Sequence, residues 1–166
     1  MSGASDKPAL LGGSPVRTEP FTTWPPTSDA AVEAIAAVAR SGVWSASDGP
    51  VKTEFEAAFA AHHDTTHGIA VCNGTIALEI ALSALGIGSG DEVIVPAYTF
   101  LATATAVLKV NALPIFVDVD PDYACMDPDA VEAAITPRTK AIIPVHLAGH
   151  AADMDRLGAI AAKHGL

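Results

Sequence analysis

The sequence predicts an α/β protein whose mainly parallel sheet is covered by helices on both faces. From residue 68 onward, short apolar runs alternate with segments whose apolar residues recur at helical spacing. Val93–Val95 and Ile142–Val145 are apolar runs typical of strands buried on both faces. Such alternation builds right-handed βαβ units. We expect strands at Gly68–Cys72, Glu92–Val95, Leu113–Val117 and Ala141–Val145, and helices at Thr75–Leu85, Leu101–Val110, Pro128–Ile135 and Ala152–His164.

The segment before this alternation has a different character. Five of the twelve prolines fall within residues 1–26, which predicts an extended N-terminal arm. A Thr-Ser-Asp start signal and a Ser-Gly stop signal bound a helix over Ala30–Arg40. A second helix is expected after Pro50, with Phe55 and Phe59 four residues apart and turned inward.

Composition excludes several classes of function. The chain has 166 residues, 50% of them hydrophobic, and 19 acids against 9 bases give a formal net charge of −10. Nucleic-acid binding needs a basic face, so we expect no nucleic-acid partner. The N-terminus has no signal-peptide pattern and no apolar run approaches about 18 residues, so we expect a cytoplasmic protein without a membrane segment. Cys72 and Cys125 are expected to be reduced thiols, and the six histidines show no metal-ligand spacing, so no metal is assigned.

The junction Asn73-Gly74-Thr75 carries the strongest functional signal. An apolar strand ends at a glycine and a helix begins at once, so free backbone N–H groups and the positive end of the helix dipole meet there. Such a junction binds phosphate. Taken alone, it could equally be a tight turn without a ligand.

The carboxyl ends of the other predicted strands carry further polar and aromatic groups. Tyr98 and Phe100 follow one strand, Asp118 and Asp120 the next, and His146 the last. Ligands of open α/β sheets bind at this edge, so we expect a site for a flat, phosphorylated ring. The two aspartates could act as an acid–base pair, but the proline that follows them favours a strand cap and a turn. His146 could contact the ligand or be a satisfied histidine at the edge of the sheet.

Ordered motifs along the chain resemble one family. They are Asn73-Gly74-Thr75-x-Ala77-Leu78, Pro96–Thr103, Asp118-Val119-Asp120, Thr136–Ile142 and Val145–Met154. Together they resemble the DegT/DnrJ/EryC1/StrS aminotransferases, which are fold-type I pyridoxal-phosphate enzymes that aminate keto-sugars and keto-cyclitols. Residues 10–17 further resemble cyclitol and amino-sugar aminotransferases, and the middle of the chain resembles 3-amino-5-hydroxybenzoate synthase.

The resemblance implies roles for individual residues. Gly74 and Thr75 match the pair that binds the phosphate of pyridoxal phosphate, and Phe100 matches the aromatic that stacks on its ring. Tyr98 is a weaker candidate for the same site. Trp44 matches a region that lines the substrate pocket. Without the family, Phe100 could be a core residue and Trp44 a packing anchor.

The family also requires a lysine that binds the cofactor covalently and an acid that holds the pyridine nitrogen protonated. None of the five lysines has the family's lysine context, and both groups are expected beyond Leu166. We therefore expect residues 1–26 to be an arm and residues 27–166 an incomplete large domain, inactive alone. In the whole protein, the resemblance implies a homodimer that moves an amino group from glutamate or glutamine to a keto-sugar or keto-cyclitol, in antibiotic or cell-surface sugar biosynthesis.

Two alternatives remain. Some relatives have histidine in place of the lysine and dehydrate deoxysugars with the same cofactor. A non-catalytic α/β module that binds a phosphorylated ligand is also compatible with the residues present. A dinucleotide-binding domain is disfavoured, because no Gly-x-Gly-x-x-Gly motif follows a strand.

Overall fold

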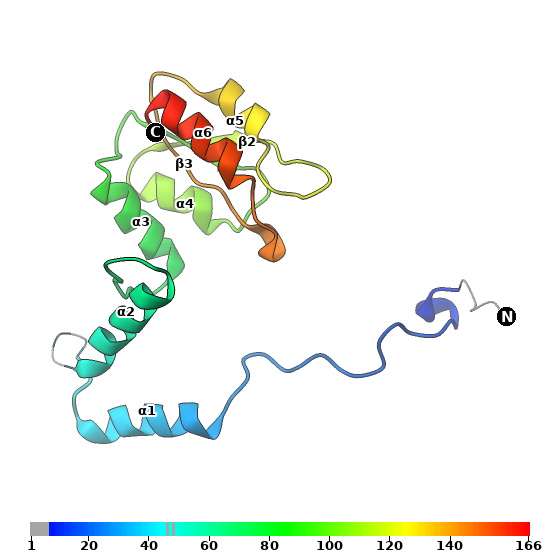
Figure 1. The fold of residues 1–166 in the computed structure, drawn as a ribbon, viewed down its shortest axis with the longest axis vertical. Coiled ribbons are helices and arrows are strands. Elements are labelled where there is room, and N and C mark those ends of the chain that lie inside the picture. The colour runs from blue at the N-terminus through cyan, green and yellow to red at the C-terminus, as the bar shows by residue number, and fades with distance from the viewer. Residues whose placement is uncertain (1–6, 46, 48) are drawn as a thin grey trace. The chain divides into compact units, whose positions relative to one another are not determined.

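A computed structural model describes residues 7–45, 47 and 49–166 (Figure 1). The chain divides into two compact units, one ending at Gly68 (unit 1) and one spanning Ile69–Leu166 (unit 2). None of the helices within the described ranges is long and apolar enough to cross a bilayer.

Unit 1 contains the arm and the first two predicted helices. The 3-10 helix η1 (Ala9–Leu11) precedes an exposed segment without helix or strand over residues 12–28. The helix α1 (Asp29–Ser41) begins where Ser28 accepts a hydrogen bond from the N–H of Ala31 at 3.2 Å. It ends at Gly42, whose φ of 71° is the left-handed conformation that glycine adopts readily. The helix α2 (Pro50–His62) follows, so both predicted helices are confirmed.

The expected inward orientation of Phe55 and Phe59 is wrong. Their exposed fractions are 55% and 50%, and Ala60 is the buried residue of α2. The two rings lie one helical turn apart with centroids 5.7 Å from each other, and Phe59 also contacts the ring of His63 at 4.4 Å. Helical spacing therefore correctly predicted that the two rings share one face of α2. That face lies at the surface, where the two rings pack against each other.

Unit 2 is built on a parallel sheet, as predicted, and its strand order is β2-β1-β3. The strands are β1 (Glu92–Pro96), β2 (Leu113–Val117) and β3 (Thr139–Ile142). Every residue of the central strand β1 is buried. The helices of unit 2 are α3 (Gly74–Ala84), α4 (Ala102–Lys109), α5 (Pro128–Ala134) and α6 (Met154–His164), and η2 (Leu147–Gly149) is a short 3-10 turn.

Alternating side chains of β1 divide the core between the two faces of the sheet. Val93 and Val95 join a buried cluster with residues of α3 and α4. Ile94 joins the other cluster, which contains residues of α5 and α6. The two helix pairs thus lie on opposite sides of the strands (Figure 1). This arrangement confirms helices on both faces of the sheet.

The strand expected at Gly68–Cys72 does not form. Residues 67–71 have no regular structure, and Ile69 is 77% exposed. A strand exists only as part of a ladder, and the described ladder consists of β2, β1 and β3. The last strand also differs from the expected Ala141–Val145: β3 spans Thr139–Ile142, and just beyond it the N–H of Ile143 still donates to the carbonyl of Ile94 at 2.9 Å.

Glu92 is a buried carboxylate at the start of β1, with an exposed fraction of 2%. It accepts hydrogen bonds from the Thr136 hydroxyl and from the guanidinium of Arg138, whose Nε lies 2.9 Å away. The Thr136 hydroxyl, and then Arg138, lower the pKa of Glu92 below its ordinary value of 4.5. A carboxyl whose pKa is lower in the folded state stabilises the fold above pH 4.5, and this stabilisation is lost as the pH falls further.

Replacing Glu92 with glutamine is expected to lower the thermal unfolding midpoint at neutral pH, because Arg138 and Thr136 lose their carboxylate partner. The variant should also lose part of the wild-type decline in stability below pH 4.5. Circular dichroism melts from neutral pH down to about pH 3 measure both effects. Glu33→Gln, at an ion pair whose side chains are both 69% exposed, is the control and should change little. An unaltered acid dependence in the Glu92 variant would contradict this account.

Candidate functional site: a phosphate-binding helix terminus

The amino end of α3 holds two open hydrogen-bond donors. Asn73 is extended, and its side-chain oxygen accepts the N–H of Ile76 at 3.0 Å while its carbonyl accepts that of Ala77 at 3.1 Å. No residue that the structure describes accepts a hydrogen bond from the N–H of Gly74 or Thr75. The role of Asn73 was not predicted, although asparagine before a helix is a strong N-cap signal. The cap leaves these two N–H groups free for a ligand.

Gly74 makes this end of the helix accessible. A Cβ atom built on it would meet no atom within 4 Å, so the space in front of the backbone is open. Thr75 is half-buried and adds a hydroxyl beside the two amides. Adjacent N–H donors at the positive end of a helix dipole form an anion site. This arrangement fits a phosphate group.

The topology of unit 2 places this helix end at the carboxyl edge of the sheet. A cavity of about 720 Å³ is lined by Leu85 after α3, Asp91 before β1, Lys140 at the start of β3 and Gly165 after α6. The far end of α3 therefore lies at the amino edge of the sheet. The 11 residues of α3 span about 16 Å. Gly74 and Thr75 consequently lie at the opposite, carboxyl edge.

The aromatic residues after β1 are at the surface of this edge. Phe100 is 80% exposed and Tyr98 is 60% exposed, so Phe100 is not a core residue. The hydroxyls of Thr99 and Thr103 lie 2.8 Å apart and tie this segment to the first turn of α4. Phe100 therefore offers a ring face to solvent next to the end of the central strand.

His146 follows β3, the neighbour of β1, and so belongs to the same edge. Its side chain is exposed, and its Nδ1 accepts the N–H of Ala152 at 3.1 Å. A ring nitrogen that accepts a backbone N–H carries no hydrogen, which places the ring hydrogen on Nε2. His146 thus has a hydrogen-bond partner at Nδ1, and no residue that the structure describes accepts its Nε2–H.

Asp118 and Asp120 cap and turn the chain, as the sequence favoured. The Asp118 carboxylate accepts the N–H of Val119 at 2.8 Å. The Asp120 carboxylate accepts the N–H groups of Asp122 at 2.8 Å and Tyr123 at 3.2 Å. The bonds of Asp120 form an Asx turn, so both carboxylates bind nearby backbone N–H groups and have a structural use.

Trp44 belongs to unit 1. Its side chain is 76% exposed, and its Nε1–H donates to the carbonyl of Ala39 at 3.2 Å. It lines a pocket of about 600 Å³ together with Val38 of α1 and Pro50 and Lys52 of α2. The sequence did not predict this pocket, because it depends on how the two helices approach each other.

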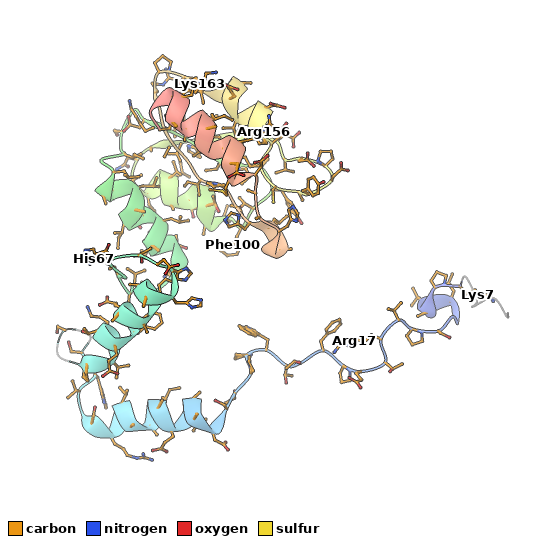
Figure 2. All side chains as sticks on the ribbon, viewed as in Figure 1. Lys7, Arg17, His67, Phe100, Arg156 and Lys163 are labelled. Carbon is orange, nitrogen blue, oxygen red and sulfur yellow. The ribbon has the colours of Figure 1, made fainter. Side chains whose placement is uncertain are left out.

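The lysines of unit 2 lie away from the candidate site. Lys109 ends α4 and lies 3.5 Å from a carboxylate oxygen of Glu79, and Lys140 is the second residue of β3. Lys163, near the end of α6, pairs with Glu132 at 2.5 Å. Figure 2 shows Lys163 and Phe100 at opposite ends of unit 2. Within the described ranges, no three histidine, cysteine, aspartate or glutamate residues gather where they could hold a metal ion.

Fold and site define a class of protein: an α/β protein with an open helix N-terminus, a candidate phosphate site, at the carboxyl edge of a parallel sheet. The sequence profile of the DegT/DnrJ/EryC1/StrS aminotransferase family matches residues 26–166. The chain therefore belongs to this family.

Individual relatives agree with that assignment. The chain is 46% identical to the L-glutamine:2-deoxy-scyllo-inosose aminotransferase of Streptomyces kanamyceticus over 98% of its own length and 39% of the relative's. Among solved structures, 3-amino-5-hydroxybenzoic acid synthase superposes with a TM-score of 0.86 at 46% identity, covering 90% of this chain and 39% of that one. NtdA from Bacillus subtilis with the bound cofactor PMP gives a TM-score of 0.77 at 41% identity over 81% and 31% of the two chains. The chain thus spans about two fifths of the length of the curated relative.

Proposed function

We propose that this chain supplies the phosphate-binding and ring-contacting part of a pyridoxal-phosphate-dependent aminotransferase. The amino group would pass from glutamine or glutamate to a ketone on a cyclitol or sugar. The observation that carries this proposal is the pair of open N–H donors at Gly74 and Thr75. Family membership and relatives that act on an inosose or bind PMP support the choice of cofactor and substrate class.

The residues present fit the cofactor. Gly74 and Thr75 would hold the phosphate through two backbone N–H groups and one hydroxyl. Phe100 would cover one face of the pyridine ring, and its high exposure leaves that face available. When bound, pyridoxal phosphate supplies the electron-withdrawing ring that allows a C–N bond to be exchanged. His146 would donate its Nε2–H to an oxygen of the ligand, and Tyr98 and Trp44 would contact the substrate.

None of the five lysines of the chain is proposed to bind the cofactor covalently. Lys109, Lys140 and Lys163 lie at the amino edge of the sheet, about the length of a strand from the phosphate site. Lys52 in α2 pairs with Glu56 at 3.4 Å, and Lys7 lies in the arm. The chain alone is therefore expected to hold the cofactor without turnover.

This expectation can be tested with pyridoxal phosphate and borohydride. After incubation of the chain with the cofactor, reduction and proteolysis, mass spectrometry should show only weak labelling spread over several exposed lysines. Equilibrium dialysis of the unreduced sample should still show binding. A stoichiometric adduct at one defined lysine would contradict the claim that the covalent residue is not among these five. Absence of any binding would contradict the proposed function itself.

We also propose that the whole protein is a homodimer and that it is located in the cytoplasm. Exposed apolar side chains of α1, such as Val32 at 54% and Ile35 at 72%, support association with a second subunit. The net charge of −10 supports the proposed absence of a nucleic-acid partner. A non-catalytic phosphate-binding module would share the same helix terminus, but the aminotransferase relatives favour an enzyme.

A further inference from the structure

Two loops at the carboxyl edge meet although their strands do not. The β2 loop (residues 118–127) leaves the end of β2, and the β3 loop (residues 143–153) leaves the end of β3. These strands flank β1 on opposite sides. The loops nevertheless meet at His150, through a ring contact and a hydrogen bond.

The first contact is between two rings. The rings of Tyr123 and His150 are parallel, with an interplanar angle of 2° and centroids 5.0 Å apart. In the second contact, the thiol of Cys125 donates to the carbonyl oxygen of His150 at 3.4 Å. Cys125 is only 5% exposed and belongs to the core cluster that also contains Met126 and Ala152. The β2 loop is therefore anchored in the core through Cys125, and it holds His150 by the ring contact and the hydrogen bond.

The β3 loop transmits this constraint to His146. A tight turn links the two histidines: Ala148 and Gly149 have φ of 50° and 87°, and the N–H of Gly149 donates to the carbonyl of His146 at 3.2 Å. The ring of His146 closes the loop by accepting the N–H of Ala152, which is 4% exposed. Hydrogen bonds therefore hold the histidines at both ends of this turn.

We propose that Tyr123 and His150 are positioning residues that fix the tautomer and direction of His146 at the carboxyl edge. Their stacked rings hold the turn so that Nδ1 faces Ala152 and Nε2–H stays free for the ligand. The role of the Nε2–H donor toward a ligand rests on the proposed function. The effect of the Tyr123–His150 contact on His146 is instead a property of the chain without ligand or cofactor.

The test follows the His146 ring in the ligand-free chain. Long-range ¹⁵N–¹H spectra of histidine-labelled protein should show His146 with its hydrogen on Nε2 in the wild type. In Tyr123→Ala we expect a mixture of tautomers and about fivefold lower protection of the Ala152 amide against hydrogen exchange. Tyr123→Phe keeps the ring stack and should restore both signals. Because Tyr123 is 59% exposed, its truncation should leave the fold intact.

Controls make the outcome decisive. Asp122→Ala changes a neighbouring side chain in the same loop and should leave both signals at their wild-type values. His150→Leu removes the ring pair from the other side and should repeat the effect of Tyr123→Ala. An unchanged His146 tautomer in both ring-pair variants would overturn the inference. Since no cofactor is added, that result would not contradict phosphate binding at the amino end of α3.

Discussion

A Gly74→Asp variant is expected to bind pyridoxal phosphate at least about a hundredfold more weakly than the wild-type chain, because like charges in a site cost several kcal/mol. Gly74 is the first residue of α3, and a Cβ there would meet no atom within 4 Å. An aspartate at this position favours the helix through its dipole, so the fold should not be weakened. Equilibrium dialysis gives the affinity, and a thermal melt reports the fold.

The matched control is Gly158→Asp in α6. Gly158 is exposed and has equally open surroundings, so this variant adds the same charge away from the candidate site. It should bind pyridoxal phosphate like the wild type. Equal affinities of the two variants would show that the phosphate is held somewhere other than the amino end of α3.

An Ile94→Ala variant is expected to lose about 2–5 kcal/mol of unfolding free energy. Ile94 lies in the central strand with an exposed fraction of 0%, and it packs in the cluster that contains Met126, Val131 and Leu157. Truncation removes buried methyl groups and leaves a cavity between the sheet and α5 and α6. Urea unfolding followed by circular dichroism should show a lower midpoint with a similar slope.

Ile80→Ala is the control for this change. Ile80 lies on α3 and is 45% exposed, so the same truncation should cost well under half as much. If both variants lost the same free energy, β1 would not be the centre of the core. The site would then lack the rigid strand from which Phe100 is presented.

Local signals explain most of the fold that the sequence predicted. The strand Leu113–Val117 has the predicted bounds, and the helices differ from their predicted ends by at most two residues. Caps and apolar runs are properties of a few neighbouring residues, so they can be interpreted without the fold. The missing strand at Gly68–Cys72 depended instead on a partner strand, which a local pattern does not reveal.

The same distinction applies to the candidate site. The open donors of Gly74 and Thr75 could be predicted from sequence because they belong to adjacent residues at the start of a helix. The stack of Tyr123 on His150 could not, because the two lie 27 positions apart in the sequence and meet only when both loops have folded. The hydrogen bond between His146 and Ala152 likewise depends on the left-handed turn at Ala148, a residue with no strong preference for it.

Binding of the phosphate of pyridoxal phosphate at the amino end of α3 can be followed by an amide ¹H–¹⁵N titration of the wild-type chain. Pyridoxal, which lacks the phosphate, is the comparison. We expect the largest shifts at the N–H groups of Gly74 and Thr75 with pyridoxal phosphate, and almost none at either with pyridoxal. Shifts centred elsewhere, or equal shifts with pyridoxal, would contradict phosphate binding at this end of the helix.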